Sequence, residues 1–405
     1  MKVLVLNCGS SSIKYQFIDT ERKLALAKGI VERIGMSSAV LSHTPLDKPT
    51  IKIVGEILDH TIAIEYVIAV LLSPNHGVIQ HKNEISAVGH RVVHGGETFA
   101  GSVLITDQVM KAMYDVIDLA PLHNPPNIKG IQACQKHLPD VPQCGIFDTS
   151  FHVNMPHRAF LYGIPYELYK KYKIRKYGFH GTSHRYVSER AAALMNKPID
   201  QFKIITCHLG NGCSMAAVDC GRSIDTTMGF TPLEGLIMGT RSGDMDPYVI
   251  LYIMNKEELS IHDANTLLNK HSGLVGISGE SADMREIETA VKEGSKRAKY
   301  AFDVFCYRIK KYIGAYTAAM GGLDSVVFTG GIGENSVMVR SEVCKNMEYL
   351  GIELDDEVNN SKPYGETLLS KQNGKVKVFK IPTNEELVIA LDTEAIVKEQ
   401  MENGK

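Results

Sequence analysis

The stretch that decides the fold class is VLVLNCGSSSIKYQFI, at residues 3–18. Residues 3–6 are four consecutive aliphatic residues, typical of a buried β-strand, and residues 13–18 alternate loosely, as a second strand would. Between them lies a turn rich in glycine and serine, residues 7–12. We expect a strand–loop–strand hairpin here, followed by a third strand over residues 23–30.

The same pattern recurs near the middle of the chain. Residues 203–207 are a second buried-strand run, which leads into the glycine-containing loop His208-Leu209-Gly210-Asn211-Gly212. Strands are expected again beyond this loop, over residues 213–219 and 224–227. Because the two loops occupy matching places, the sequence predicts an internal duplication on the scale of half the chain.

The remaining segments mix helices and strands. We expect helices over residues 60–72, 107–119, 128–138, 284–293, 296–320 and 384–400, and buried strands over residues 85–93, 143–147, 324–328 and 376–381. The polar stretch 359–375 is expected to be a surface loop. This order favours an α/β fold, and a length of 405 residues favours two or three domains.

Composition argues against several classes of function. The formal net charge is −2, so no broad basic field is available to hold nucleic acid or an anionic membrane. The longest nearly apolar run, residues 61–72, contains Glu65 and cannot span a bilayer. The eight cysteines form no C-x-x-C pair, and the first residues are too short for a signal-peptide core, which together favour the cytoplasm.

The glycine-rich loops are candidates for gripping phosphate. Backbone N–H groups and the hydroxyls of Ser10, Ser11 and Ser12 can face phosphate oxygens, and Lys14 adds a positive charge. For each loop taken alone, an ordinary structural turn is the alternative. A third candidate is the run Gly330-Gly331-Ile332-Gly333-Glu334-Asn335, which could admit a nucleotide against bare backbone. The common P-loop, the G-x-G-x-x-G fingerprint and the protein-kinase motifs are missing from the sequence.

Four further segments combine polar side chains with glycine or proline, at residues 90–96, 147–152, 177–184 and 239–247. Capped turns are one explanation, which suits Ser183 as the cap of a helix beginning near His184. It suits Arg91 and Arg241 less well, because apolar or glycine residues flank both, and a confined arginine needs a carboxylate or a phosphate. Asp283, at the start of an expected helix, is predicted to cap it.

Taken together, these segments resemble the acetate kinase family, and the match runs from residue 1 to about residue 400. The motifs that carry it are residues 7–15 (NCGSSSIKY), 89–96 (GHRVVHGG), 120–125 (APLHNP), 147–152 (FDTSFH), 177–184 (YGFHGTSH), 231–236 (TPLEGL), 239–244 (GTRSGD) and 382–387 (PTNEEL). The resemblance implies two duplicated α/β domains of the actin-like ATPase (ribonuclease H-like) fold with a nucleotide cleft between them. It places these domains at residues 1–150 with 385–405 and at residues 151–384, and it implies a homodimer.

The resemblance also implies an enzyme that transfers a phosphoryl group reversibly between ATP and acetate, and it assigns residues to that task. Its catalytic set matches Arg91, Asp148, His180 and Arg241. Its ATP contacts match Ser10, Ser12, Lys14, His208, Leu209, Gly210, Asn211, Gly212, Asp283, Met284, Arg285, Gly331, Ile332, Gly333, Glu334 and Asn335. Its substrate contacts match Arg91 and an apolar pocket for the acetate methyl group, made of Val93, Leu122, Phe179 and Pro232. Its magnesium-site residues match Asn7 and Glu385, with Mn²⁺ as an alternative metal.

The expected chemistry is direct in-line transfer without a covalent enzyme intermediate. Arg91 and Arg241 would neutralise transition-state charge from two sides, and His180 would donate a further hydrogen bond. Asp148 is expected to organise magnesium or to orient an arginine, because acetate is already ionised at pH 7 and needs no general base. Three alternatives stay open: a propionate or butyrate kinase, a pyrophosphate-linked acetate kinase, and a nucleotide-driven chaperone or filament protein of the same fold.

Overall fold

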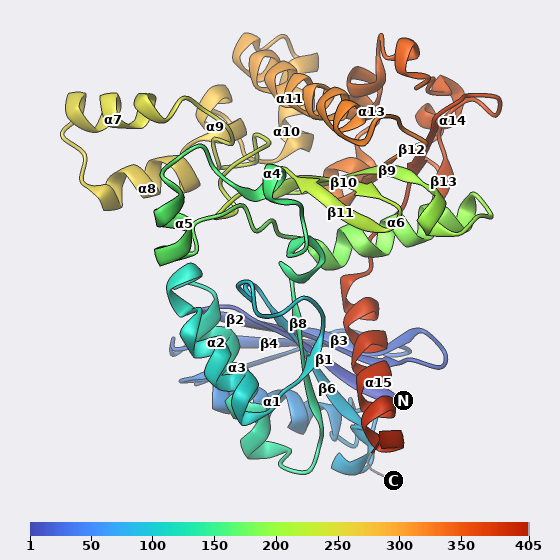
Figure 1. The fold of residues 1–405 in the computed structure, drawn as a ribbon. Helices are drawn as coiled ribbons and strands as arrows, with labels where there is room; N and C mark the ends of the chain where they lie inside the picture. Colours follow the sequence, from blue (N-terminus) through green and yellow to red (C-terminus); the bar gives the residue numbers. More distant parts are fainter. Residues whose placement is uncertain (404–405) are drawn as a thin grey trace. The chain divides into compact units, whose positions relative to one another are not determined.

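The computed structural model describes residues 1–403 of the 405-residue chain. Contacts within the chain divide it into two compact units, Met1–Val153 with Asn384–Lys405, and Asn154–Thr383. Each unit is built on its own β-sheet, and Figure 1 labels the elements of both. The domain boundaries expected at residues 150 and 384 stay a prediction.

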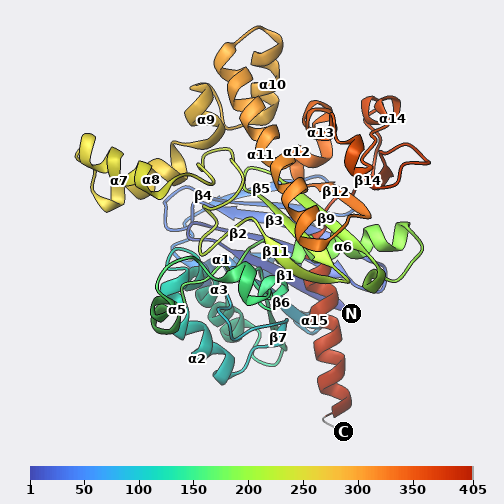
Figure 2. The ribbon, with the colours of Figure 1, turned by 45° about the horizontal axis from the view of Figure 1, so that its top comes forward.

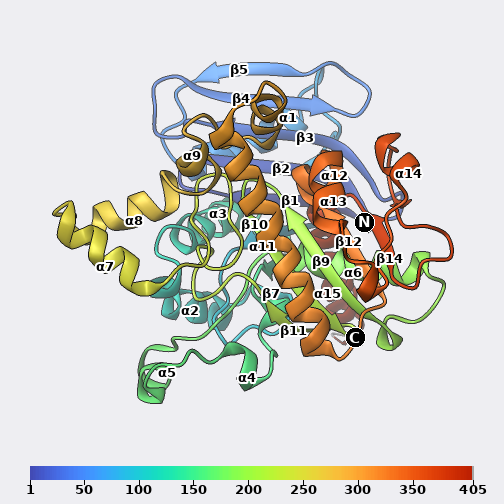
Figure 3. The same ribbon diagram turned by 90° about the horizontal axis from the view of Figure 1, so that it is seen from above.

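The first unit contains an eight-stranded sheet with the order β5-β4-β3-β2-β1-β6-β8-β7. Its strands are β1 (Lys2–Cys8), β2 (Ser12–Asp19), β3 (Leu24–Glu32), β4 (Ala39–Pro45), β5 (Ile51–Gly55), β6 (Ala87–Val92), β7 (Val103–Leu104) and β8 (Gln143–Phe147). The first five strands pair antiparallel and lie side by side in Figure 3. In contrast, β1, β6 and β8 pair in parallel, so their carboxyl ends meet at one edge of the sheet.

Helices cover both faces of this sheet. They are α1 (His60–Leu71), α2 (Asp107–Asp115), α3 (Asn124–His137) and α15 (Glu385–Asn403), with the short 3₁₀ helices η1 (Lys82–Glu84), η2 (Ile117–Leu119) and η3 (Ser150–His152). Side chains alternate along β1, so that Leu4 and Leu6 pack in the core with α1 and α3, whereas Val3 and Val5 pack against Ile389 of α15. The last helix of the chain therefore closes the core of the first unit.

The second unit contains a six-stranded sheet with the order β11-β10-β9-β12-β14-β13. Its strands are β9 (Lys203–Leu209), β10 (Cys213–Asp219), β11 (Arg222–Thr226), β12 (Ser325–Thr329), β13 (Thr367–Leu368) and β14 (Lys377–Lys380). Its helices are α4 (His157–Phe160), α5 (Tyr166–Tyr172), α6 (Gly181–Leu194), α7 (Pro247–Lys256), α8 (Ile261–Lys270), α9 (Gly273–Ser278), α10 (Met284–Lys292), α11 (Lys296–Met320), α12 (Gly330–Asn335), α13 (Val337–Cys344) and α14 (Asp356–Asn360), with the 3₁₀ helices η4 (Ile199–Gln201) and η5 (Glu348–Leu350). Figure 1 shows α6 on one face of this sheet and α11 on the other, and Figure 2 shows α7 and α8 paired away from it.

The two sheets repeat one topology. In the first sheet, the order β3-β2-β1-β6-β8 combines an antiparallel hairpin with parallel neighbours. In the second sheet, β11-β10-β9-β12-β14 has the same order and the same pairing directions. The α/β class and the internal duplication predicted from the sequence are therefore confirmed.

Several local predictions were wrong. Residues 330–335 form the short helix α12 instead of an open loop, and the expected surface loop 359–375 contains β13, which pairs with β14. Helix α3 begins at Asn124 instead of residue 128, because Pro125 and Pro126 occupy its first turn, where no backbone donor is needed. Within residues 1–403, no helix has both the length and the apolar character needed to cross a membrane.

Candidate functional site

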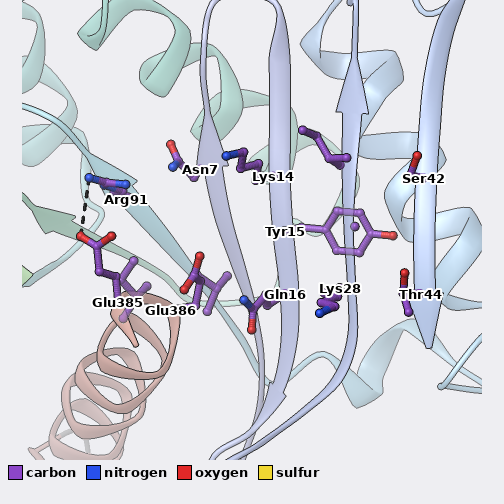
Figure 4. A pocket seen from close by; sticks show the side chains of 14 residues that line it. Asn7, Lys14, Tyr15, Gln16, Lys28, Ser42, Thr44, Arg91, Glu385 and Glu386 are labelled. Carbon is purple, nitrogen blue, oxygen red and sulfur yellow. Dashed lines mark ion pairs between the residues drawn. The ribbon is translucent and has the colours of Figure 1, made fainter. Parts of the chain in front are cut away.

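A cavity of about 320 Å³ opens on the first sheet, and Figure 4 shows the side chains around it. Four predicted site residues line it: Asn7, Lys14, Arg91 and Glu385. The strand register explains this gathering, because Asn7 of β1 lies opposite Arg91 of β6 on one side and Lys14 of β2 on the other. Glu385 reaches the same cavity from the first turn of α15.

Arg91 is held by two carboxylates. Its Nε donates to Oδ1 of Asp148 at 2.9 Å and its Nη2 donates to Oδ2 at 2.8 Å, while Nη2 also lies 3.6 Å from Oε1 of Glu385. Asp148 follows β8 and is 3% exposed. Burial opposes the charged form of Arg91, but the charges of Asp148 and Glu385 outweigh it, so that the pKa of the guanidinium is raised. Arg91 therefore carries a fixed positive charge in a fixed orientation.

The oxygen atoms of Asn7 and Glu385 suit a magnesium ion. Oε1 of Glu385 is buried and has no hydrogen-bond partner within residues 1–403, and burial raises the pKa of its carboxyl group, opposed by Arg91 and supported by Asp148. A buried carboxylate oxygen without a donor suits a cation. In the same range, no group of three or more His, Cys, Asp or Glu side chains could hold a metal ion. Any magnesium here therefore depends on phosphate oxygens and water for its remaining ligands.

The segment that carries Val93 is fixed by its backbone. The N–H of Val93 donates to Oδ1 of Asn127, and the N–H of Gly95 donates to Oγ1 of Thr149. The amide of Asn127 in turn donates to the carbonyl oxygen of Cys8 at 2.8 Å, which ties the turn after β6 to the end of β1. Of the predicted acyl-pocket residues, Val93 is half-buried and Leu122 is exposed in the first unit.

Of the residues predicted for the first phosphate loop, only Lys14 lines the cavity that contains Arg91. The N–H of Gly9 donates to the carbonyl oxygen of Ser12 at 2.8 Å, which closes the turn between β1 and β2. Lys14 lines the cavity with Arg91, but Ser10 lines a separate cavity of about 540 Å³ beside His60. Ser12 lines neither of these two cavities.

In the second unit, two predicted catalytic side chains meet above a glycine. A Cβ atom built on Gly212 would lie 3.5 Å from Nη1 of Arg241 and 3.7 Å from Nε2 of His180. Because Gly212 has no side chain, this position between an arginine and an imidazole is left clear. Burial lowers the pKa of Arg241, whose Nη1 donates to the carbonyl oxygen of Pro232 at 3.2 Å.

The turn before α6 corrects one prediction. The helix begins at Gly181, and His180 precedes it in the left-handed conformation, with φ of 56°. Ser183 lies inside the helix and does not cap it; its Oγ lies 2.8 Å from Nδ1 of His208. The His208 ring stacks on the His180 ring with centroids 4.2 Å apart. Ser183 therefore orients His208, and His208 supports His180.

Asp244 fixes the segment that carries Arg241. Its Oδ1 accepts from the N–H of Gly235 at 2.7 Å, and its Oδ2 accepts from the hydroxyl of Tyr312 at 2.5 Å. Arg308 adds an ion pair at 3.2 Å. Because Tyr312 and Arg308 belong to α11, Asp244 anchors the segment to the longest helix of the unit. The sequence motif contained Asp244 but gave it no role.

A cavity of about 820 Å³ in the second unit gathers most of the predicted nucleotide contacts. It is lined by Gly210, Asn211, Asp283, Met284, Arg285, Gly331, Ile332 and Asn335, and also by Ala282, Glu288 and Ser336, which the sequence analysis missed. Asp283 caps α10 by accepting from the N–H of Arg285 at 2.9 Å, so the predicted cap is confirmed. Glu288 lies four residues after Met284 on the same helix face, a spacing that could have identified it.

Glu334 and Gly333, two of the predicted nucleotide contacts, instead contact neighbouring backbone and core residues. Oε1 of Glu334 accepts from the N–H groups of Gly330 at 3.0 Å and Thr383 at 3.3 Å, and Gly333 is buried against Phe328. Neither Glu334 nor Gly333 is among the residues that line the cavity. Phe179 is buried and Pro232 is half-buried; both belong to the second unit, whereas Val93 and Leu122 belong to the first.

Comparison with known proteins gives a consistent result. The profile of the Acetokinase family matches residues 2–391. The chain is 56% identical to the acetate kinase of Desulfitobacterium hafniense, over 98% of this chain and 100% of that one, and 57% identical to the acetate kinase of Thermoanaerobacterium thermosaccharolyticum, over 98% and 99%. The crystal structure of Porphyromonas gingivalis acetate kinase matches with a TM-score of 0.96 and 48% identity, over 98% of this chain and 99% of that chain. A propionate kinase from Francisella tularensis matches with a TM-score of 0.90 and 42% identity over the same shares. The match to these structures confirms the predicted two-domain actin-like ATPase fold.

Proposed function

Because this chain belongs to the acetokinase family, we propose that it transfers the γ-phosphoryl group of ATP reversibly to acetate, giving acetyl phosphate and ADP. The observation that carries the proposal is the clear position above Gly212, bordered by Arg241 Nη1 and His180 Nε2. Phosphoryl transfer asks a protein mainly for position and positive charge, and an arginine and a histidine around bare backbone provide both.

The proposed reaction is one in-line step. A carboxylate oxygen of acetate forms a bond to the γ-phosphorus while the bond to the bridging β–γ oxygen breaks, and that oxygen leaves with its electron pair on ADP. Arg91 and Arg241 neutralise the charge on the equatorial oxygens, and His180 donates a hydrogen bond to one of them. Losing one such donor typically costs about 3 kcal/mol, or roughly a hundredfold in rate.

Asp148 acts through Arg91 in this proposal. Acetate carries no proton at pH 7, and a carboxylate leaving group needs none in the reverse direction, so a general base has no task. The two-point contact between Asp148 and Arg91 supports a positioning role, since it fixes both the charge and the plane of the guanidinium.

The nucleotide and metal are assigned as follows. We propose that ATP places its adenosine in the cavity lined by Asp283, Arg285 and Ile332, with its phosphates toward Gly210 and Gly212. Glu385 and Asn7 would hold Mg²⁺, directly or through water, with Mn²⁺ as an alternative. The ion would neutralise charge on the β- and γ-phosphates. Val93, Leu122, Phe179 and Pro232 are proposed to enclose the methyl group of acetate.

We also propose a cytoplasmic homodimer. All eight cysteines are free thiols, which supports a reducing compartment. A second copy is the proposed partner for the exposed side of α7, which presents Tyr248, Leu251 and Tyr252. Such a concentration of exposed large apolar side chains is typical of subunit interfaces. Sedimentation equilibrium, compared between the wild-type protein and Leu251→Asp, tests the dimer.

One assay tests the function. The purified protein is incubated with MgATP, hydroxylamine and acetate, propionate or butyrate in parallel, and the acyl hydroxamate is measured. We expect acetate to give the highest kcat/KM, as the acetate kinase relatives at 54–57% identity suggest. A higher kcat/KM for propionate would instead favour the alternative raised by the propionate kinase structure. No hydroxamate with any acid, with either ATP or pyrophosphate, would reject the kinase reaction.

A further inference from the structure

Beneath His180, four side chains form one hydrogen-bonded chain. Oγ1 of Thr206 lies 2.7 Å from Nδ1 of His184, and Nε2 of His184 lies 2.7 Å from Oγ of Ser214. The same Oγ lies 2.8 Å from Nδ1 of His180. Thr206, His184 and Ser214 are each 0% exposed, so this chain is shut off from solvent below the imidazole.

The sequence builds this chain from two elements. In the antiparallel pair of β9 and β10, Ser214 lies opposite His208 and Ala216 lies opposite Thr206. Side chains alternate along a strand, so Thr206 and Ser214 project from the same face of the sheet. Helix α6 contacts this pair of strands and contributes His184 from its first turn, where the N–H of His184 donates to the carbonyl oxygen of His180 at 3.0 Å.

The positions of the protons follow from counting donors. Within residues 1–403, the Thr206 hydroxyl has one hydrogen-bond partner, Nδ1 of His184. A buried O–H group without an acceptor is costly, so this hydroxyl donates to Nδ1. Nδ1 of His184 then carries a lone pair, and the ring proton of His184 lies on Nε2.

The same count continues to His180. His184 Nε2–H donates to Oγ of Ser214, and a hydroxyl group has only one proton to donate. The Ser214 proton therefore points to its other partner, Nδ1 of His180. Because Nδ1 of His180 accepts, its ring proton lies on Nε2, the atom that borders the clear position above Gly212.

We propose that Thr206, His184 and Ser214 are positioning residues, which fix the tautomer of His180 so that Nε2–H faces the transferring phosphoryl group. This inference rests on the proposed function, in which His180 donates to a phosphoryl oxygen. Without the chain, the ring would divide between two tautomers, and the one with the proton on Nδ1 would turn a lone pair toward an anion. The three residues touch no substrate and act only through His180.

A pair of substitutions at Thr206 separates this role from packing. Thr206→Val keeps the shape and removes the hydroxyl, whereas Thr206→Ser keeps the hydroxyl and removes a methyl group. We expect Thr206→Val to lower kcat about tenfold, with KM for ATP and acetate little changed. The size of the effect is taken by analogy from residues that orient a metal-binding histidine through a hydrogen bond. Thr206→Ser should keep kcat near the wild-type value. A merely structural role predicts the reverse order, because the smaller serine would leave a cavity.

The tautomer itself can be read by nitrogen NMR. In protein labelled with ¹⁵N-histidine and free of substrates, the His180 signals are assigned by their loss in His180→Gln. We expect the wild type and Thr206→Ser to carry the proton on Nε2, and Thr206→Val to show a mixture. If Thr206→Val does not fold, Ser214→Ala serves with the same expectation.

The outcomes are distinct. A wild-type His180 with its proton on Nδ1 overturns the proposal, as does a Thr206→Val protein with unchanged tautomer and unchanged kcat. Because the spectra are recorded without substrate, they decide the tautomer even if the protein fails to phosphorylate acetate. A failure of the proposed function and a failure of this inference are therefore separate results.

Discussion

Arg91 and Asp148 face each other with matched geometry, Nε to Oδ1 at 2.9 Å and Nη2 to Oδ2 at 2.8 Å. The arginine belongs to β6 and the aspartate follows the neighbouring parallel strand β8. Because both strands are anchored in the core, the pair holds its shape before any substrate binds. This arrangement favours Asp148 as the residue that orients Arg91.

The first prediction tests that coupling. Asp148→Asn keeps the size and removes the charge, and we expect kcat to fall roughly a hundredfold or more, because Arg91 loses its fixed orientation. Arg91→Lys should cause a similar loss, since lysine cannot make the two-point contact. If the pair acts as one unit, the double variant should be little worse than either single variant in kcat/KM. Losses that simply multiply would show that Asp148 has a task apart from Arg91.

A second prediction concerns Glu385 and magnesium. Replacing it by glutamine removes a buried charge beside Arg91, in the cavity that Asn7 also lines, and we expect a strongly raised magnesium requirement for activity. Glu386→Gln is the matched control, because Glu386 lines the same cavity one residue further along α15. An unchanged magnesium titration for Glu385→Gln would remove Glu385 from the metal site.

The same substitution gives a prediction about pH and stability. Burial raises the pKa of Glu385, so above the ordinary range of a glutamate the folded chain binds more protons than the unfolded chain. The contribution of Glu385 to the free energy of unfolding therefore falls as pH rises. Without metal and nucleotide, Glu385→Gln should have a higher Tm than the wild type at pH 7, and the difference should shrink toward about pH 4. A lower Tm at pH 7 would mean that the ion pair with Arg91 outweighs the cost of burial.

Another prediction uses the clear position above Gly212. A Cβ atom there would meet its nearest neighbours at 3.5 Å and 3.6 Å, which are ordinary contacts, so Gly212→Ala should fold with little change in Tm. The methyl group would nevertheless stand between Arg241 and His180, and we expect a large loss of kcat. Gly314→Ala is the control, since a Cβ at this position in α11 has no neighbour within 4 Å and should leave activity intact. Full activity of Gly212→Ala would show that phosphate does not pass over this glycine.

The sequence alone identified the duplicated hairpins because buried strands and glycine loops are local signals. Residues 143–147 and 296–320 were predicted with the bounds that the structure gives to β8 and α11. The short helix α12 was missed because three glycines in six residues favour a loop. Its helical form depends on tertiary contacts, including the bond from the N–H of Gly330 to Glu334.

The site shows the same division between local and distant signals. Arg91 and Arg241 could be picked out because a confined arginine needs an anion. Their surroundings could not, since the contact of Arg91 with Asp148 depends on the pairing of β6 with β8. Ser214 was missed for the same reason: it is an ordinary strand residue until the register places it between two histidines.

The last prediction concerns the length of the acyl group. The acids named for the acetate kinase and propionate kinase relatives differ by one methylene. The proposed pocket is apolar, and such a pocket distinguishes neighbouring homologues by only about 1–3 kcal/mol, so the size of a single side chain can change the preference. Val93 is suited to that role because its backbone N–H is held by Asn127 and a β-branched side chain has few χ1 rotamers with which to make room for a longer acid. Val93→Ala should raise the ratio of kcat/KM for propionate to that for acetate.

The ratio of the two kcat/KM values is insensitive to a general loss of activity, because reduced stability or slower phosphoryl transfer lowers kcat/KM for propionate and for acetate alike. Val54→Ala, an exposed valine on β5, should leave the ratio unchanged. An increase confined to Val93→Ala would place Val93 at the acyl chain and explain how one fold serves acids of two lengths. If both variants keep the wild-type ratio, the limit on acyl length lies elsewhere, and Leu122, Phe179 and Pro232 become the next positions to vary.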